Sequence, residues 1–173
     1  EDEERITQAA GLLSDMSGTY GRADLMTLLL HDPKNRTQRD MLIQCMGITE
    51  ESTSKKAVSL VKRMSLESRD YELMEDMLRF KRSSLRKELL NFLMGQKEGD
   101  MEQCLKRLLS DKREEKRDGG LDLLLRMSKD KEKAEFYGKV KTLASLVETP
   151  TDKEKVLLGE ILGEKKSSAA DQK

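Results

Sequence analysis

The feature that most constrains the fold of this chain is the spacing of its apolar residues. They recur at steps of three and four along almost the whole sequence, as in Leu42, Cys45 and Met46, and this spacing indicates amphipathic helices. Glycine, proline and serine interrupt each stripe before it extends over three heptads, which excludes one long coiled coil. We therefore predict about ten short helices that fold back on one another.

The composition agrees with an all-helical core. The chain has 173 residues, of which 36% are hydrophobic and only 3% aromatic, with two prolines and no tryptophan. A core made of Leu, Met, Ile, Val and Ala, beside 38% charged residues, favours helices over sheets. The length fits one domain or one run of small repeats.

Signals for helix ends lie between the stripes. Thr151 and Glu154 have the spacing of a capping box, and Asp111 and Glu114 have a looser version of it. Pro150 marks a second candidate start for the last helix, because proline is favoured at the first helical position. We expect three glycines to end helices in a C-cap role: Gly47, Gly95 and Gly163.

Part of the sequence repeats itself. Residues 77–93 align with residues 108–124 at an offset of 31, which matches Arg86 with Arg117. Residues 29–42 give a third copy, in which glutamine replaces that arginine. A helix pair cannot bury its apolar face alone, so serial repeats of this kind predict hairpins stacked side by side on a shared core.

Residues 22–147, and most closely 101–127, resemble the HEAT repeat family. The likeness lies in a Leu-Leu helix end, an Asp-Pro turn at Asp32, and the six-residue spacing from Asp111 to Arg117. The chain departs from the family in three places, at Phe80, Lys116 and Gly119-Gly120. Segments 105–127 and 149–158 also resemble, more weakly, long uncharacterised bacterial proteins with HEAT-like regions.

The HEAT resemblance implies a right-handed α-solenoid of antiparallel hairpins, of the HEAT or armadillo type. It also implies that the turn aspartate and the helix arginine bond between neighbouring repeats. On this basis we expect a structural role for Asp111 and Arg117, and for their counterparts Asp32 and Arg86. The resemblance implies no catalytic residue.

The densest local cluster of charge is basic. Five basic side chains fall within residues 79–87, beside the acidic residues Glu75, Asp76 and Glu88. The stretch suits an acidic partner, a phosphate backbone or an anionic surface, or it is simply the solvated edge of a helical hairpin. Ser83 and Ser84, which follow two of these residues, form a weak phosphorylation pattern. The candidate patch consists of Arg79, Lys81, Arg82, Arg86 and Lys87.

Other residue classes limit the function. Lys and Arg total 33, and Asp and Glu also total 33, so the chain lacks the basic excess of a dedicated nucleic-acid binder. The single histidine, His31, fits a helix C-terminus rather than a zinc cluster. Cys45 and Cys104 lie on apolar stripes, which favours buried thiols over a disulfide. We expect no metal, no cofactor, no membrane contact and no enzymatic activity, in a cytoplasmic protein.

Residues 1–163 are predicted to form a single α-helical repeat domain, followed by a polar disordered tail over 164–173. The composition of both ends suggests a fragment of a larger protein. The favoured function is a non-catalytic scaffold that contacts another protein or another domain of the same chain. The alternative is a nucleic-acid-binding HEAT-like module that uses the basic stretch 79–87, and a helical enzyme with an unrecognised site is less favoured.

Overall fold

A computed structural model describes residues 1–15 and 22–163. Over these residues the chain forms ten α-helices and two short 3₁₀ helices, with no β-strand, which confirms the predicted all-helical class. Contacts divide the chain into two compact units, Glu1–Leu89 and Leu90–Lys173. The single repeat domain predicted over 1–163 stays a prediction, and the tail predicted over 164–173 lies outside the described residues.

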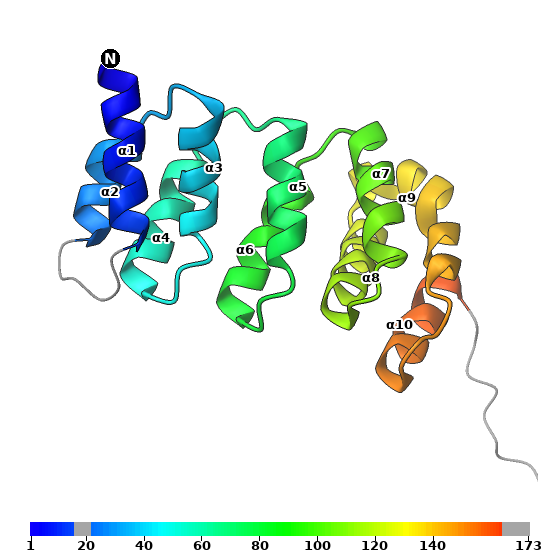
Figure 1. The fold of residues 1–173 in the computed structure, drawn as a ribbon. Helices are drawn as coiled ribbons and strands as arrows, with labels where there is room; N and C mark the ends of the chain where they lie inside the picture. The colour runs from blue at the N-terminus through cyan, green and yellow to red at the C-terminus, as the bar shows by residue number, and fades with distance from the viewer. Residues whose placement is uncertain (16–21, 164–173) are drawn as a thin grey trace, which may run out of the picture. The chain divides into compact units, whose positions relative to one another are not determined.

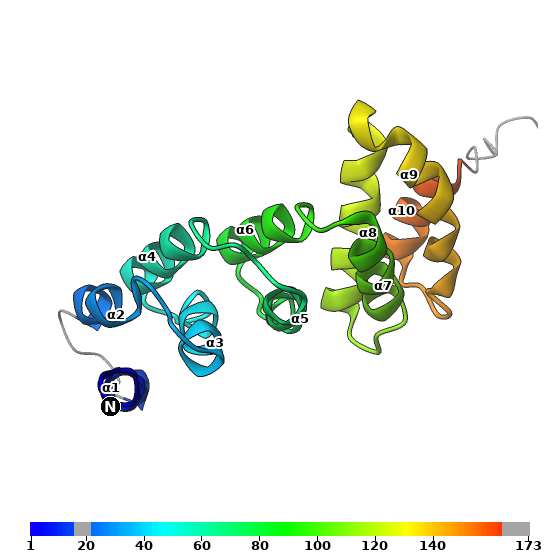
Figure 2. The same cartoon turned by 90° about the horizontal axis from the view of Figure 1, so that it is seen from above.

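The first unit is built from two layers of helices (Figures 1 and 2). In one layer α3 contacts both α1 and α5, and in the other α2 contacts α4, with α6 beside α4. Within the hairpins, α1 packs on α2 and α3 packs on α4. The helices are α1 (Asp2–Asp15), α2 (Arg22–Leu30), α3 (Arg36–Cys45), α4 (Glu51–Val61), α5 (Ser68–Met77) and α6 (Ser83–Leu93), the last of which continues into the second unit.

Between the layers of the first unit lies an aliphatic core. The completely buried side chains there are Leu30, Ile43, Met46, Val61 and Met74, and Leu42 and Leu78 are almost completely buried. Leu42, Met46, Val61, Met74 and Leu78 fall on the predicted apolar stripes of α3 to α5, so the three-and-four spacing identified the buried face of these helices. In α2 the predicted stripe of Leu25, Leu28 and Leu29 is wrong, because Leu25 and Leu28 are exposed and the core is reached by Met26 and Leu30 instead. Among the described residues of the first unit no aromatic side chain is fully buried, since Tyr71 and Phe80 are only partly so.

The second unit starts from the antiparallel pair α7 (Glu98–Leu109) and α8 (Glu114–Lys129). Gly120 permits their close approach, because a Cβ atom there would lie 2.9 Å from Leu109 Cδ2 and 3.2 Å from Leu108 Cβ. After α8 come η1 (Lys131–Lys133), α9 (Ala134–Val140), η2 (Lys141–Leu146) and α10 (Asp152–Leu162). Both α9 and α10 pack on α8, and η2 packs on α7.

The last helix begins and ends as the sequence predicts. Thr151 is its N-cap, and Thr151 and Glu154 form the reciprocal bonds of a capping box. Gly163 is its C-cap and adopts a left-handed conformation with φ +73°, which glycine tolerates because it has no Cβ atom. The alternative start that uses Pro150 at the first helical position is wrong, because α10 begins at Asp152.

Two other predicted helix ends are wrong. The α8 helix begins at Glu114 with Arg113 as N-cap, so Asp111 is not its cap, although Asp111 Oδ1 accepts a hydrogen bond from the Arg113 N–H. Gly47 is not a left-handed C-cap either, since Gly163 is the one described residue with positive φ. A Cβ atom on Gly47 would lie 2.9 Å from Phe80 and 3.1 Å from Met77, so close packing explains this glycine.

Candidate functional site

Arg117 makes the most extensive set of polar contacts in the second unit. Its Nε and Nη2 atoms donate to the two carboxylate oxygens of Glu154 at 2.8 and 3.2 Å, and Nη1 donates to the backbone carbonyls of Asp111 and Lys112. This arrangement needs the planar fork of an arginine, because lysine cannot supply donors in three directions from one rigid group. Arg117 thereby joins the α7–α8 turn to the start of α10.

Glu154, on the other side of this ion pair, is completely buried. Burial alone would raise its pKa, but the hydrogen bonds from Arg117 and from the Thr151 backbone outweigh burial and hold the pKa below its usual value. The Asp111 carboxylate, by contrast, lies 3.5 Å from Lys116 Nζ and does not receive the Arg117 guanidinium. The contact between Asp111 and Arg117 therefore runs through the aspartate backbone.

In the first unit a second buried carboxylate also joins two helices through hydrogen bonds from arginine. Asp70, at the start of α5, is completely buried and accepts hydrogen bonds from both Arg36 and Arg39 of α3. It also accepts the backbone N–H of Glu67 at 2.8 Å. Burial would raise the pKa of Asp70, but the bonds from Arg39 and Arg36 hold that pKa below its ordinary value.

Three helices share this device, in which the third residue of the helix is polar, buried and bonded to the preceding hairpin. We call these residues the N3 anchors. Gln38 of α3 is 1% exposed and donates from Nε2 to Thr7 Oγ1 and to the Glu3 carbonyl of α1. The other two N3 anchors are Asp70 and Glu154.

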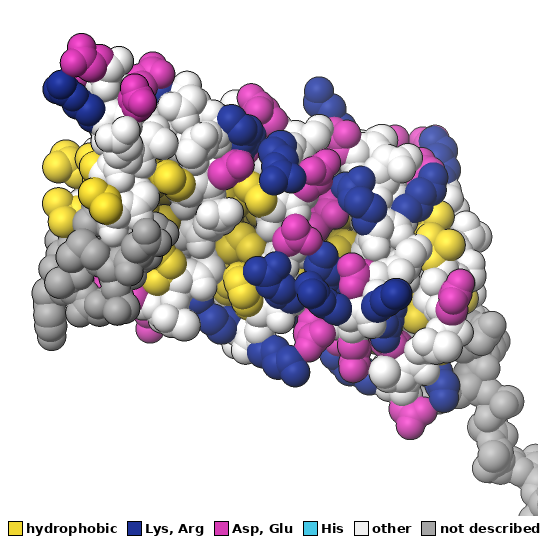
Figure 3. Space-filling model, viewed as in Figure 1, with side chains coloured by type: hydrophobic (Ala, Val, Ile, Leu, Met, Phe, Trp, Pro, Cys, Tyr) yellow, Lys and Arg dark blue, Asp and Glu magenta, His cyan; other side chains and the backbone are white. Residues whose placement is uncertain are grey.

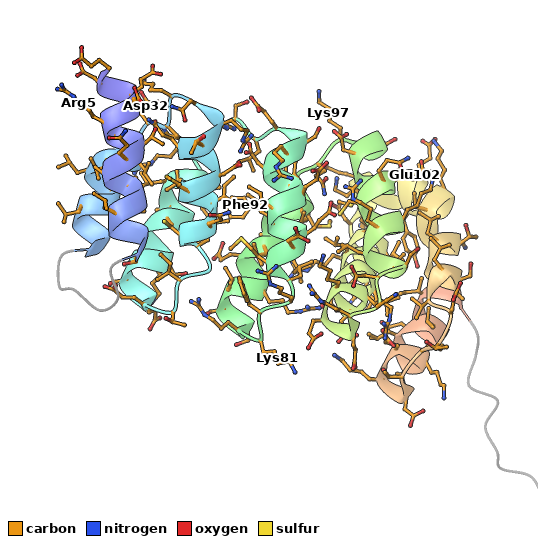
Figure 4. All side chains as sticks on the ribbon, viewed as in Figure 1. Arg5, Asp32, Lys81, Phe92, Lys97 and Glu102 are labelled. Atoms are coloured by element: carbon orange, nitrogen blue, oxygen red, sulfur yellow. The ribbon has the colours of Figure 1, made fainter. Side chains whose placement is uncertain are left out.

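The helix boundaries show that the predicted repeat register matched two turns of different kinds. Asp32 lies in the turn from α2 to α3, where it is exposed and pairs with Lys34, whereas Asp111 lies inside the α7–α8 hairpin. Figure 4 shows Asp32 and Lys81 at opposite ends of the helices of the first unit. The copy at residues 29–42 is therefore out of phase with the copy at 77–93, which runs from α5 into α6.

The predicted basic patch is not one continuous free surface. Arg82 is half-buried and donates to the carbonyls of Gly47 and Ile48 at 3.1 and 2.6 Å, so it holds the turn between α3 and α4. Arg79 lies over the Phe80 ring, 4.8 Å from its centre. Arg86 is half-buried in α6, while Lys81 and Lys87 are exposed, with Lys81 pointing away from the helices in Figure 4.

A groove of about 320 Å³ lies between α4 and α6. Its floor includes the buried side chains of Val58 and Leu85, and its sides carry lysines, serines and glutamates. Lys55 pairs with Glu51 at 2.6 Å, and Lys62, the C-cap residue of α4, pairs across the groove with Glu88 of α6 at 3.0 Å. We call this feature the α4–α6 groove.

A second cleft, of about 510 Å³, adjoins the Arg117 contacts in the second unit. It lies between the α7–α8 turn and the segment that leads from η2 to α10. Its lining mixes charged and hydroxyl side chains with the partly exposed Leu146. The two charged residues that the sequence singled out, Asp111 and Arg117, both border it.

Large apolar side chains are exposed at one end of the first unit. Leu12 of α1 is 69% exposed, and Leu25 and Leu28 of α2 are 47% and 68% exposed. Figure 3 shows hydrophobic side chains gathered over α1 and α2. Large exposed apolar patches are typical of surfaces that other molecules cover.

The remaining candidates have structural settings. Cys45 and Cys104 are both buried, as predicted, and His31 Nδ1 lies 2.9 Å from the Leu28 carbonyl at the end of α2. Among residues 1–15 and 22–163, no group of His, Cys, Asp and Glu is placed to hold a metal ion. Within the same ranges, no helix combines the length and the apolar character needed to cross a bilayer.

Sequence reasoning missed most of the partners in these contacts. It identified Glu154 as a helix cap but not as the partner of Arg117, and it gave no role to Asp70. A usable signal was present, because each N3 anchor is a polar residue three positions after an Asn, Glu or Thr that precedes a helix. The other missed residues are Arg36, Arg39 and Gln38.

Comparison with known proteins gave one match. The model of a family described as a family of unknown function (DUF5724) matches residues 1–173. No curated protein matched the chain, and no solved structure matched it.

Proposed function

The chain belongs to the DUF5724 family, whose function is unknown, and we propose that it is a non-catalytic helical-repeat scaffold that holds another protein or another domain of the same chain. The proposed architecture is an α-solenoid of the HEAT or armadillo type. In such an architecture each hairpin contributes one layer of core and one strip of surface, and the surface is what a partner contacts.

The observation that carries this proposal is the sequence separation of the long-range hydrogen bonds. Gln38 bonds to Thr7, 31 residues away, and Arg36 bonds to Asp70, 34 residues away. Arg117 bonds to Glu154 over 37 residues. In a stack of repeats each unit contacts only its neighbours, so long-range contacts fall at about one repeat length. A closed bundle would add contacts between elements far apart in the chain.

The repeat length separates this chain from typical HEAT repeats. The starts of α1, α3 and α5 are 34 and 32 residues apart. HEAT repeats are about 40–47 residues long. The hairpins proposed here are therefore compact variants, with helices of 9 to 14 residues in the first two pairs.

Surface features support a binding role for the scaffold. Leu12, Leu25 and Leu28 offer apolar area that a partner would remove from water, and the α4–α6 groove offers a second contact region with a buried floor. The buried carboxylates of Asp70 and Glu154 form ion pairs that join one helix to another, which is a structural role. They are poor candidates for catalysis because arginine neutralises both carboxylates.

Site-specific photo-crosslinking tests the binding role. A benzophenone amino acid would replace Leu28 or Lys55 in the full-length protein, with Lys139, an exposed residue of α9, as the control position. We expect a defined cross-linked product from Leu28 or Lys55, to a single other protein or to another domain. Absence of a product at both positions above the Lys139 background would refute the scaffold. Small-angle scattering that fits a closed globular bundle would refute the solenoid.

A further inference from the structure

The charge around the α4–α6 groove is unlike that of the rest of the chain. Residues 50–64 and 79–89, which form α4, α6 and their flanking turns, contain nine basic and three acidic residues. The whole chain has equal numbers of the two kinds. Net positive charge is therefore concentrated on these two helices and, above all, on their flanking turns, and the groove itself is lined by the bases Lys55, Lys62 and Arg82 against the acids Glu51 and Glu88.

Within this basic region, Lys55 and Lys62 are the side chains best placed to bind. Their side chains are 73% and 54% exposed, and both belong to the wall that α4 contributes to the groove. Lys55 pairs with Glu51, which is itself 74% exposed, so this surface ion pair contributes little to stability and can exchange for a ligand carboxylate. Lys62 pairs with Glu88, which is only 31% exposed, but an ammonium group has three donors and can contact a second carboxylate without leaving Glu88. Arg82 is different, because its guanidinium is already used by the α3–α4 turn.

The shape and chemistry of the groove favour a polypeptide over a nucleic acid. Val58 and Leu85 are buried at its floor and offer contact to an aliphatic side chain. Its described lining contains no aromatic side chain on which a base would stack. Lys55 and Lys62 are two helical turns apart, about 10 Å along α4, which about three residues of an extended chain span.

From these observations we propose that the α4–α6 groove binds an acidic polypeptide segment, in which carboxylates engage Lys55 and Lys62 and an aliphatic side chain contacts Val58 and Leu85. The proposal rests on the scaffold function above and names the chemistry of the partner. The Ser84 hydroxyl also borders the groove and offers a hydrogen bond to a bound carboxylate or backbone carbonyl, whereas the hydroxyls of Ser54 and Ser59 already donate to the carbonyls of Met46 and Lys55.

The test is a fluorescence anisotropy titration with a labelled dodecapeptide of repeating Glu-Glu-Leu, run at low and at physiological salt. A Gln-Gln-Leu peptide and a single-stranded DNA of equal length are the comparison probes. We expect the acidic peptide to bind, the Gln peptide to bind at least about tenfold more weakly, and the affinity to fall as salt increases. DNA should bind more weakly than the acidic peptide.

Variants localise the binding. Lys55→Glu with Lys62→Glu should weaken peptide binding by about tenfold or more, and the milder pair Lys55→Gln with Lys62→Gln should follow in the same direction. The control is Lys106→Glu with Lys139→Glu, because each of these lysines pairs with a glutamate four residues away on an exposed helix face, as Lys55 does. Circular dichroism checks that every variant is folded.

The outcomes are distinct. Binding that is lost in the groove variants and kept in the control supports the proposal. No binding of the acidic peptide, equal loss in the control, or tighter binding of DNA would overturn it. A specific cross-link from Leu28 together with a negative peptide titration would leave the scaffold intact and reject only the acidic partner, so the two proposals fail separately.

Discussion

Asp70→Asn tests whether a buried carboxylate anchors the α3 and α5 helices. In the folded chain Asp70 accepts hydrogen bonds from Arg36, Arg39 and the backbone N–H of Glu67. Asparagine keeps one acceptor oxygen and turns an NH₂ group toward a guanidinium, so one arginine loses its partner. The Arg39 side chain is only 18% exposed, so water cannot replace the lost charge fully. Breaking a buried pair in this way costs about 3 kcal/mol.

The assay is urea unfolding followed by far-ultraviolet circular dichroism at neutral pH. We expect Asp70→Asn to lower the free energy of unfolding by about 3 kcal/mol. The control is Glu102→Gln, which removes an exposed helical pair with Lys106 and should cost less than about 0.5 kcal/mol. A loss below about 1 kcal/mol for Asp70→Asn would refute the anchoring role, because it would match an exposed pair.

The difference in the free energy of unfolding between the native chain and Asp70→Asn should depend on pH with a defined sign. The folded-state pKa of Asp70 is lowered, so its carboxylate stabilises the fold at every pH above the unfolded value of about 3.9. That contribution is lost as the pH falls through the lower folded-state pKa. The difference between the native chain and Asp70→Asn should therefore shrink below about pH 4. A difference that stays constant from neutral pH to about pH 2 would contradict this explanation.

The remaining predictions concern the second unit and the cysteines. Glu154→Gln removes the carboxylate paired with Arg117, whose side chain is 12% exposed, and we expect a loss of about 3 kcal/mol in urea unfolding that also diminishes below about pH 4, since the pKa of Glu154 is lowered too. Gly120→Ala should lower stability by about 1–2 kcal/mol despite the better helix propensity of alanine, because the new Cβ atom meets α7, whereas Gly99→Ala, with nothing within 4 Å, should be neutral or stabilising in a thermal melt. Cys45 and Cys104 should react with a thiol reagent only as fast as the chain opens, and rapid stoichiometric labelling of the native chain would contradict their burial.

The sequence predicted the helices well because their signal is local. The apolar stripes of α3 to α8 require only that buried residues recur on one face, and the Thr151 capping box requires only four consecutive residues. The stripe predicted for α2 was wrong, because its leucines allow more than one apolar face and the neighbouring helices bury Met26 and Leu30. The packing roles of Gly47 and Gly120 were harder to predict, because the atoms that exclude a Cβ atom belong to distant parts of the fold rather than to the same helix. A glycine needed for close packing looks the same in sequence as one that ends a helix.

The candidate contacts were predicted only in part, for a related reason. The spacing of Asp111 and Arg117 marked a real contact, but the dominant partner of Arg117 is Glu154, which lies 37 residues away. Arg82 belonged to a dense basic run, yet its donors face carbonyls that appear only when the α3–α4 turn has formed. The out-of-phase copy at 29–42 shows that a pattern of charges and leucines does not by itself distinguish a turn within a hairpin from a turn between hairpins.

The N3 anchors have a consequence for the order in which the chain assembles. Each anchor bonds backward, Gln38 to Thr7, Asp70 to Arg39, and Glu154 to Arg117. A polypeptide that leaves the ribosome from its N-terminus has therefore already made the receiving group when each anchoring residue emerges. The growing chain can therefore secure α3, α5 and α10 at their first turns without waiting for downstream sequence.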